Sequence, residues 1–375
     1  MPVELFAPIN KEILRDFEIT SRAAQISLSV QDSPHLIEFR YAYPLASPEI
    51  RGRGNSLPIL IPNVDRDDIV AFSMIEAAPF YRAKRVVYDP QSDHRLFSAN
   101  GSTADELIYV LNLTELILLG EGSTPEERVA SIFQKERMTK AVVVKRGALG
   151  AVVFERGKNC VSVPAFRSPR VFKIGSGDIF TATFSYFWLE RNLGVVEAAT
   201  FASRNVADYV ISKDAKILSD AELTDANFSP RQVVGNAGQI YLAAPFFSKE
   251  QRWLLDKMYD ALEGLGSKIF SPVHHVGFGE PEDVARQDLI GLDESASVVA
   301  LLNETDPGSI FEVGYAVARE KPVTIFTEKM AHRDLTMMTG TNCRVLQDFT
   351  SVAYNAVWDS IGTDEKKSTT AFRRH

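Results

Sequence analysis

The sequence predicts an α/β protein of two domains, each built on a largely parallel sheet. Its 375 residues are long for one domain and ample for two. Short apolar runs rich in β-branched residues, which are typical of buried parallel strands, alternate with longer helical patterns. A polar, mixed stretch over 213–238 interrupts the alternation and indicates a linker. We therefore predict an N-terminal domain over 1–230, a smaller doubly wound domain over 236–362 and a mobile tail over 363–375.

Composition limits the classes of function. Hydrophobic residues make up 45% of the chain and charged residues 24%, the ordinary balance of a globular protein. A net charge of −8 argues against a nucleic-acid-binding surface. The start lacks the features of a signal peptide, and no apolar stretch is long enough to span a membrane. Cys160 and Cys343 form no disulfide framework, and the six histidines have no metal-ligand spacing. We expect a cytoplasmic protein with no nucleic-acid or membrane partner and without metal-ligating residues.

Apolar periodicity and helix-start signals place the elements of both domains. The stretch 66–83 is predicted as a helix because acids open it. Other helices of the N-terminal domain are expected over 10–17, 104–111 and 195–211. One further helix is expected to begin at 124, and another is expected to end at about 191. Strands are expected at 26–30, 36–40, 57–62, 85–90, 141–144 and 151–154. The second domain is expected to have strands over 239–246, 268–273, 297–303 and 322–327, and helices over 248–264, 281–295, 309–320 and 352–361.

One stretch of the second domain joins a strand end to a helix start. The apolar run 297–303 predicts a buried parallel strand, which Asp306 and its neighbours end before a helical pattern begins. Functional groups of open α/β sheets gather at such carboxyl ends. Glu312, placed by this pattern in the first helical turn, is therefore expected to face a crevice. Taken alone, Glu312 is also explained as a helix-start acid favoured by the helix dipole.

Further candidate residues are expected at the same sheet edge. Asp306 lies at the strand end, and Tyr241 lies in another strand-like run. Asp288 and Asp293 lie on the helical stretch that precedes the organising strand. Two or three acids and a phenol that converge on one edge are the equipment for cleaving a glycosidic bond.

Residues 239 to about 330 resemble the nucleoside 2-deoxyribosyltransferase family. The matching segments are 240–247, 287–292, 306–308 and 311–316. Members of this family break the N-glycosidic bond of a deoxynucleoside through a covalent glycosyl-enzyme. The resemblance implies a small-molecule nucleoside or nucleotide substrate, no required cofactor, and a homo-oligomer in which a neighbouring chain completes each site.

The same resemblance implies a role for each candidate side chain. Glu312 matches the nucleophile, and Tyr241 matches the phenol that orients it. Asp306 and Asp288 match the acids that handle the base, and either is a candidate for protonating the leaving base. Resolution of the intermediate by a second base or by water, which means transfer or hydrolysis, stays open. Further predicted substrate contacts are Phe246, Phe247, Gly308 and Asp293.

A second motif, Gly-Ser-Gly-Asp at 175–178, precedes an apolar helix of the first domain. Free N–H groups at a helix start, together with glycines that permit close approach, can hold an anion. An ordinary helix-cap loop is the usual explanation of an isolated glycine pair. Residues 85–210 resemble the ribokinase-like (PfkB) sugar and nucleoside kinase family through 87–90, 111–115, 145–150 and 175–178. This resemblance implies phosphoryl transfer with Mg-ATP or another nucleotide.

The kinase resemblance also implies individual roles. Asp178 corresponds to the base that deprotonates the acceptor hydroxyl. About 85 residues precede the Asp89 position, and no Gly-Gly-x-x-x-Asn run is present, so we expect a domain truncated at its N-terminus in which the family's acceptor pocket is missing or rebuilt. The expected nucleotide-binding residues are Gly175, Ser176, Gly177, Asn112, Glu115, Gly147 and Gly150.

Three functions are compatible with the sequence. The leading one is N-glycosidic bond cleavage or base transfer in the second domain, with a first domain that binds a nucleotide or nucleoside. The alternatives are a PfkB-type sugar or nucleoside kinase, and a nucleotide-sensing regulatory or defence protein in which the first domain gates the second. A first domain that serves only as a scaffold for assembly is the remaining interpretation.

Overall fold

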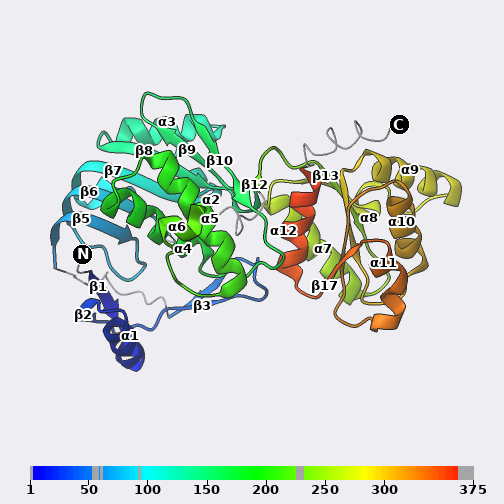
Figure 1. Ribbon diagram of the computed structural model, residues 1–375, viewed down its shortest axis with the longest axis horizontal. Coiled ribbons are helices and arrows are strands. Elements are labelled where there is room, and N and C mark those ends of the chain that lie inside the picture. The colour runs from blue at the N-terminus through cyan, green and yellow to red at the C-terminus, as the bar shows by residue number, and fades with distance from the viewer. Residues whose placement is uncertain (1–2, 53–58, 60–61, 92–93, 225–231, 362–375) are drawn as a thin grey trace.

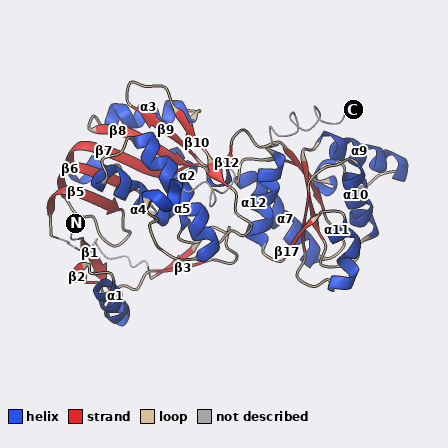
Figure 2. Cartoon of the chain, viewed as in Figure 1, coloured by secondary structure: helices blue, strands red, loops and turns tan. Residues whose placement is uncertain are grey.

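The computed structural model of the chain contains two large sheets, one in each half (Figures 1 and 2). We call the described residues up to 233 the N-terminal half and residues 239–361 the C-terminal half. The tail predicted over 363–375 lies outside the described residues. The structure describes residues 3–52, 59, 62–91, 94–224 and 232–361.

The N-terminal half is built on a six-stranded sheet of order β10-β9-β8-β7-β6-β5. Strands β5 to β8 are parallel, whereas β9 and β10 are antiparallel to their neighbours. Helices α4 and α5 pack on one face, and α2 and α3 pack on the other. The bounds are β5 (Val64–Phe72), β6 (Tyr81–Asp89), β7 (Thr103–Asn112), β8 (Thr139–Lys145), β9 (Ala151–Glu155), β10 (Val161–Val163), α2 (Leu113–Leu119), α3 (Pro125–Lys135), α4 (Ser176–Ser185) and α5 (Val195–Ser212).

Smaller elements complete this half. β1 and β2 form a parallel pair joined by α1, and β3 and β4 form an antiparallel pair. The predicted linker over 213–238 contains α6 and β12, and β12 pairs with β11. Most of the strand predicted over 57–62 lies outside the described residues. The bounds are β1 (Glu4–Ile9), α1 (Lys11–Ala23), β2 (Ser27–Asp32), β3 (Glu38–Arg40), β4 (Glu49–Arg51), η1 (Phe97–Asn100), η2 (Gly147–Leu149), β11 (Ala165–Phe166), a π-helix (Tyr186–Glu190), α6 (Asp220–Thr224) and β12 (Gln232–Val233).

Two predicted helices of this half are strands. The stretch predicted as a helix over 66–83 forms most of β5, a connecting loop and the start of β6, and the stretch over 104–111 forms β7. In β5, which is an edge of the sheet, Ile69 and Ala71 are buried, whereas Val70 between them is exposed. In β7, residues 107–111 are buried on both faces. Asp67 and Asp68, the acids that suggested a helix start for 66–83, lie in β5 before Ile69, where Asp67 is exposed and Asp68 is partly buried.

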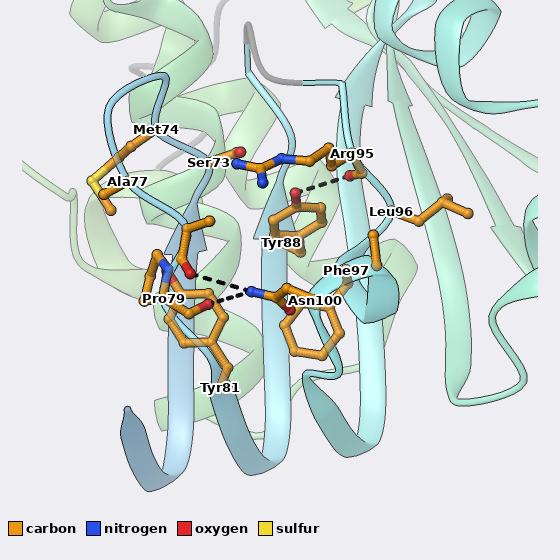
Figure 3. Close-up of a pocket in the computed structure, with 12 residues that line it drawn as sticks. Ser73, Met74, Ala77, Pro79, Tyr81, Tyr88, Arg95, Leu96, Phe97 and Asn100 are labelled. Carbon is orange, nitrogen blue, oxygen red and sulfur yellow. Dashed lines mark hydrogen bonds between the residues drawn. The ribbon is translucent and has the colours of Figure 1, made fainter. Parts of the chain in front are cut away.

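The connection from β5 to β6 runs without a helix. Residues 73–80 and η1 enclose a cavity of about 30 Å³ on the α2/α3 side of the sheet (Figure 3). The Asn100 side-chain amide donates a hydrogen bond to the Pro79 carbonyl at 2.7 Å, and the Tyr88 hydroxyl donates to the Arg95 carbonyl at 2.9 Å. A cavity of this volume has room for one or two water molecules.

The C-terminal half is a doubly wound unit, and the predicted α/β class is confirmed. Its five parallel strands have the order β14-β13-β15-β16-β17. Helices α7 and α12 cover one face, and α9 and α10 cover the other. None of the helices described is long and apolar enough to cross a membrane. The bounds are β13 (Gln239–Ala243), α7 (Lys249–Gly264), β14 (Lys268–Phe270), α8 (Pro272–His275), α9 (Pro281–Glu294), β15 (Ser297–Leu301), α10 (Pro307–Ala318), β16 (Val323–Phe326), η5 (His332–Leu335), α11 (Thr336–Gly340), β17 (Arg344–Leu346) and α12 (Phe349–Ser360).

Candidate functional site

The start of α10 follows the carboxyl end of β15. Asp306 is the N-cap of α10, and its carboxylate accepts a hydrogen bond from the Ser309 amide at 2.7 Å. Pro307, which lacks an N–H, occupies the first helical position, where no donor is needed. The helix therefore begins two residues earlier than predicted, and Glu312 lies in its second turn. Because the helix dipole acts mainly within the first turn, it explains Glu312 less well than the sequence suggested.

Glu312 and Tyr241 are held together by a short hydrogen bond. The Tyr241 hydroxyl donates to Oε1 of Glu312 at 2.6 Å, joining α10 to β13. Tyr241 is fully buried. Burial, followed by the neighbouring Glu312 charge, raises the pKa of the phenol well above its usual value. The phenol therefore stays protonated and can orient the carboxylate.

The Glu312 carboxyl is destabilised as an anion. Burial is the main cause that raises its pKa to about 7, and the negative charges of Asp288 and Asp306 add to the effect. The hydrogen bond from Tyr241 acts in the opposite direction. Within the part of the chain that the structure describes, only Oε1 of Glu312 has a hydrogen bond. Its second oxygen is free to contact a substrate.

Asp288 projects from α9 toward the same place. Its Oδ1 is buried and has no hydrogen-bond partner among the described residues. Burial raises the pKa of this carboxyl. Leaving a buried acceptor unpaired is costly, so such an atom indicates a ligand, a water molecule or a bound proton. The three acids and the phenol that the sequence singled out are therefore brought together.

Aromatic rings that the sequence analysis missed support this group. Phe270 stacks on Tyr241 with ring centroids 5.6 Å apart, and His275 stacks on Phe270 at 5.2 Å. Gly291 of α9 allows this packing, since a Cβ there would lie 2.4 Å from the Phe270 ring. A glycine inside a helical pattern was the only sequence signal for this close approach.

The predicted substrate contacts lie in different surroundings. Phe246 and Phe247 stack with centroids 4.9 Å apart, and Phe247 is 71% exposed. Gly308 is exposed at the start of α10, where a Cβ would lie 3.3 Å from Oδ2 of Asp306. The carboxylate of Asp293 is instead engaged on the surface, where it pairs with Arg319 at 3.2 Å and accepts from the Tyr315 hydroxyl at 3.1 Å. The roles predicted for these four residues remain predictions.

A second polar cluster lies in the N-terminal half, where β6 and β8 end near the start of α4. Asp89 is fully buried and pairs with Lys145 at 2.9 Å. It also accepts from the Thr181 hydroxyl at 2.7 Å. The Gln91 amide donates to Asp178 at 3.1 Å, and burial raises the pKa of Asp178. Burial lowers the pKa of Lys173, whose ammonium donates to the Ser176 hydroxyl at 3.3 Å.

The glycines before α4 have separate structural reasons. Gly175 has a φ of +79°, and a Cβ there would lie 2.5 Å from the Tyr209 hydroxyl, which donates to the Ile174 carbonyl. A Cβ on Gly177 would lie 3.7 Å from the Lys145 ammonium, so this glycine leaves space beside a cation.

The other predicted nucleotide-binding residues are engaged within the protein. Asn112 and Glu115 form a capping box at the start of α2. Gly147 and Gly150 bracket the turn between β8 and β9, and a Cβ on Gly150 would lie 2.2 Å from the Val163 carbonyl. Over the described residues, no three His, Cys, Asp or Glu side chains are arranged to hold a metal ion.

Comparison with known proteins finds one family model that matches a segment of each half. Residues 240–350 match the family model for nucleoside 2-deoxyribosyltransferase, and residues 61–221 match the model for pfkB family carbohydrate kinase. Both family resemblances are confirmed. The deoxyribosyltransferase match contains Tyr241, Asp288, Asp306 and Glu312, and the pfkB match contains Asp89, Asn112, Glu115, Lys145 and Asp178. Both families consist of enzymes.

Solved structures similar to the chain represent both families. The 2-deoxyribosyltransferase from Bacillus psychrosaccharolyticus is 28% identical, with 31% of this chain and 90% of that chain covered and a TM-score of 0.28. The ribokinase from Thermotoga maritima is 17% identical, with 59% and 79% covered and a TM-score of 0.41. The fructokinase from Vibrio cholerae O395 is 17% identical, with 59% and 84% covered and a TM-score of 0.45. The search of curated proteins found no match.

Proposed function

We propose that the C-terminal half cleaves the N-glycosidic bond of a (deoxy)nucleoside or nucleotide, with Glu312 as the nucleophile. The observation that carries the proposal is the 2.6 Å hydrogen bond from Tyr241 to Oε1 of Glu312, which leaves the second carboxylate oxygen unbonded within the described structure. The family match over 240–350 supports the class of reaction. Asp288 and Asp306, close enough to raise the pKa of Glu312, supply the acids that this chemistry needs.

The proposed reaction has two steps. In the first, a carboxylate oxygen of Glu312 attacks the anomeric carbon, and the carbon–nitrogen bond breaks with its electron pair going to the base. Asp288, whose raised pKa favours the protonated form, donates the proton that makes the base a better leaving group. Asp306 is the second candidate donor. In the second step, water or another base attacks the same carbon and gives a proton to Asp288, while the bond from the carbon to Glu312 breaks and Glu312 leaves as a carboxylate.

The test is base release from a panel of nucleosides, nucleotides and NAD. Glu312→Gln keeps the shape of the side chain and removes the nucleophile, so release should fall by a factor on the order of a thousand or more. Glu320→Gln, an exposed carboxylate just beyond α10, is the matched control and should behave like the wild type. Near-normal release by Glu312→Gln would contradict the assignment. Free base indicates hydrolysis, and base exchange indicates transfer.

A second candidate function belongs to the N-terminal half, where the cluster around Asp178 supports nucleotide or nucleoside binding. Lys145 and Lys173 lie beside the glycines at the start of α4, and the pfkB match covers this region. Calorimetry with ATP, ADP and nucleosides tests it. Binding that is lost in Gly177→Val, which crowds the Lys145 ammonium, supports a sensing role. Robust ADP formation with a sugar or nucleoside supports a working kinase, and no binding supports a scaffold.

The resemblance also leads us to propose a homo-oligomer. Three large aromatic side chains of the C-terminal half are strongly exposed, Phe247 at 71%, Phe278 at 88% and Phe311 at 62%. Phe311 directly precedes Glu312. Phe247 and Phe278 both pack against Phe246, so these exposed rings form one apolar patch of the kind that marks an interaction surface. Sedimentation at micromolar concentration should show a species larger than 41.6 kDa, and a 41.6 kDa species alone would contradict this proposal.

A further inference from the structure

Helix α12 is buried on every side. Ten of its twelve residues are buried, although a helix that covers one face of a sheet normally exposes an outer stripe. The inner side packs on β13, β15 and β16. In Figure 1, α12 and α7 lie on the side of the C-terminal half that faces the N-terminal half. The outer side of α12 is therefore covered by the N-terminal half.

The turn between β8 and β9 is one of the segments that cover it. The Trp358 indole N–H donates to the Ala148 carbonyl at 2.8 Å in a fully buried contact. A Cβ on Gly147 would lie 3.3 Å from the Tyr354 hydroxyl, and one on Gly266 would lie 3.2 Å from Leu149. This turn, which the sequence suggested for nucleotide binding, is thus packed against the C-terminal half.

The segment that follows β11 is the second contact. The Val171 amide donates to the Ser351 hydroxyl at 2.9 Å in the buried interior. Arg167 pairs with Asp359 at 2.8 Å, and Asp359 also pairs with Arg344 of β17. One carboxylate of α12 therefore joins an arginine from each half.

Apolar packing makes the contact continuous. Val171, Tyr209 and Val210 of the N-terminal half belong to the same buried cluster as Val352 and Trp358 of α12. Farther along, Tyr43 packs edge-on against Phe349 and Trp253, with centroids 5.5 Å and 6.3 Å apart. Interfaces between domains of one chain are usually more polar and permit relative motion. A shared apolar core with buried hydrogen bonds opposes such motion.

We propose that the two halves form one cooperative folding unit, in which the N-terminal half is a structural part of the C-terminal catalytic unit. Separation of the two halves would expose Trp358, Tyr354 and Val352. It would also break the hydrogen bond from the Trp358 N–H to the Ala148 carbonyl. The strands on which α12 packs include β13, which carries Tyr241, and β15, which leads to Asp306. Helix α12 thus supports the strands that position the candidate site, and its own packing depends on docking of the N-terminal half.

Hydrogen exchange of the full chain through a urea series tests this proposal, with peptides from each half read by mass spectrometry. Peptides of both halves should lose protection at one common urea midpoint. Ile132→Ala removes core volume that lies wholly within the N-terminal half, and Leu292→Ala does so within the C-terminal half. Within each variant, the urea midpoints of the two halves should fall by the same amount. Ile132→Val provides a milder version if Ile132→Ala does not fold.

The control is Ile117→Ala, at a side chain of α2 that is 56% exposed, which should leave both midpoints unchanged. Two separate midpoints in the wild type, or an Ile132→Ala shift confined to the N-terminal half, would overturn the proposal. The urea dependence of base release should follow the same common midpoint. Only this measurement of base release rests on the proposed function. Hydrogen exchange reports the coupling between the two halves even if no base is released.

Discussion

Glu312 and Glu115 are two buried carboxyls whose surroundings raise their pKa to the same value, about 7, mainly through burial. Glu115 uses both oxygens inside its own half, because Asn112 donates to one from its backbone amide and to the other from its side chain, each at 2.7 Å. Glu312 has a hydrogen bond to Oε1 alone among the described contacts. Lys145 also offsets the burial of Glu115, whereas the charges that act on Glu312 are negative.

The difference shows that a raised pKa does not by itself identify a catalytic group. Glu115 is a capping residue, and each of its carboxylate oxygens already accepts a hydrogen bond from Asn112. Glu312 combines an unbonded oxygen, a phenol that orients it and two neighbouring acids. We therefore assign the chemistry to Glu312 and a structural role to Glu115, and each prediction below tests that contrast.

The largest expected effect separates the two glutamates directly. Glu312→Gln should lower base release by a factor on the order of a thousand or more, because an amide cannot act as the nucleophile. Glu115→Gln should change it less than about twofold, because glutamine can fill the same position of a capping box. Steady-state assays at pH 7.5, with circular dichroism to confirm folding, measure both. Equal losses of base release in the two variants would contradict the different roles proposed for Glu312 and Glu115.

Asp288→Asn should have the next largest effect. Loss of the proton donor should slow release of a natural base by roughly a hundredfold, within the range typical of general acid catalysis. A nucleoside analogue with a leaving group that needs no protonation, such as a nitrophenyl deoxyriboside, should be affected only a few-fold. The ratio of the two rates is the measurement. An identical loss with both substrates would show that Asp288 is not the acid.

Tyr241→Phe should change the pH dependence of the reaction. Glu312 must be ionised to attack, so kcat/KM should fall as pH drops through about 7. The Tyr241 hydrogen bond favours the ionised form, and its removal should raise the pKa of Glu312 and move this limb to higher pH, with roughly a tenfold loss near pH 7.

Tyr315→Phe is the control for that variant. Its phenol lies on the same helix but contacts Asp293 and Arg319 instead of Glu312. It should keep the wild-type pH profile. An unshifted limb in Tyr241→Phe would show that the phenol does not set the ionisation of Glu312.

Gly291→Ala should have the smallest effect on chemistry and a measurable effect on stability. The new methyl group would lie 2.4 Å from the Phe270 ring, so the ring that stacks on Tyr241 must move. We expect a loss of about 1–3 kcal/mol in the free energy of unfolding. Gly264→Ala in α7, where a Cβ has open space, should instead be neutral or gain up to about 1 kcal/mol. Urea unfolding of both variants decides it, and equal stabilities would contradict the packing account.

Much of the C-terminal half could be predicted from sequence because its signals are local. Ser248 before α7 and Pro281 at the first position of α9 mark helix starts, and the uncharged run over 297–301 marks a central strand. The same local signals gave wrong predictions in the N-terminal half, where two predicted helices are strands. Its strand β5 carries charges because it is a sheet edge, and such a pattern does not state by itself which neighbours a strand will have.

Part of the candidate site could likewise be predicted from the sequence, and part could not. Glu312, Asp306, Asp288 and Tyr241 were identifiable because their segments resemble the nucleoside 2-deoxyribosyltransferase family. The unpaired oxygen of Asp288 and the close approach of Phe270 to Gly291 depend on how separate segments pack, and no spacing in the sequence encodes them. Asp293 shows the converse. It lies one turn after Asp288 on the same helix, yet its carboxylate is occupied by Arg319.

The most direct test of the central claim is to trap the intermediate. A 2-deoxy-2-fluoro nucleoside analogue, whose glycosyl-enzyme should break down slowly, can be incubated with the full chain before digestion and mass spectrometry. The account predicts one added glycosyl group per chain, located on Glu312 and absent from Glu312→Gln. An adduct on another residue, or base release with no adduct while Glu312→Gln remains active, would contradict it.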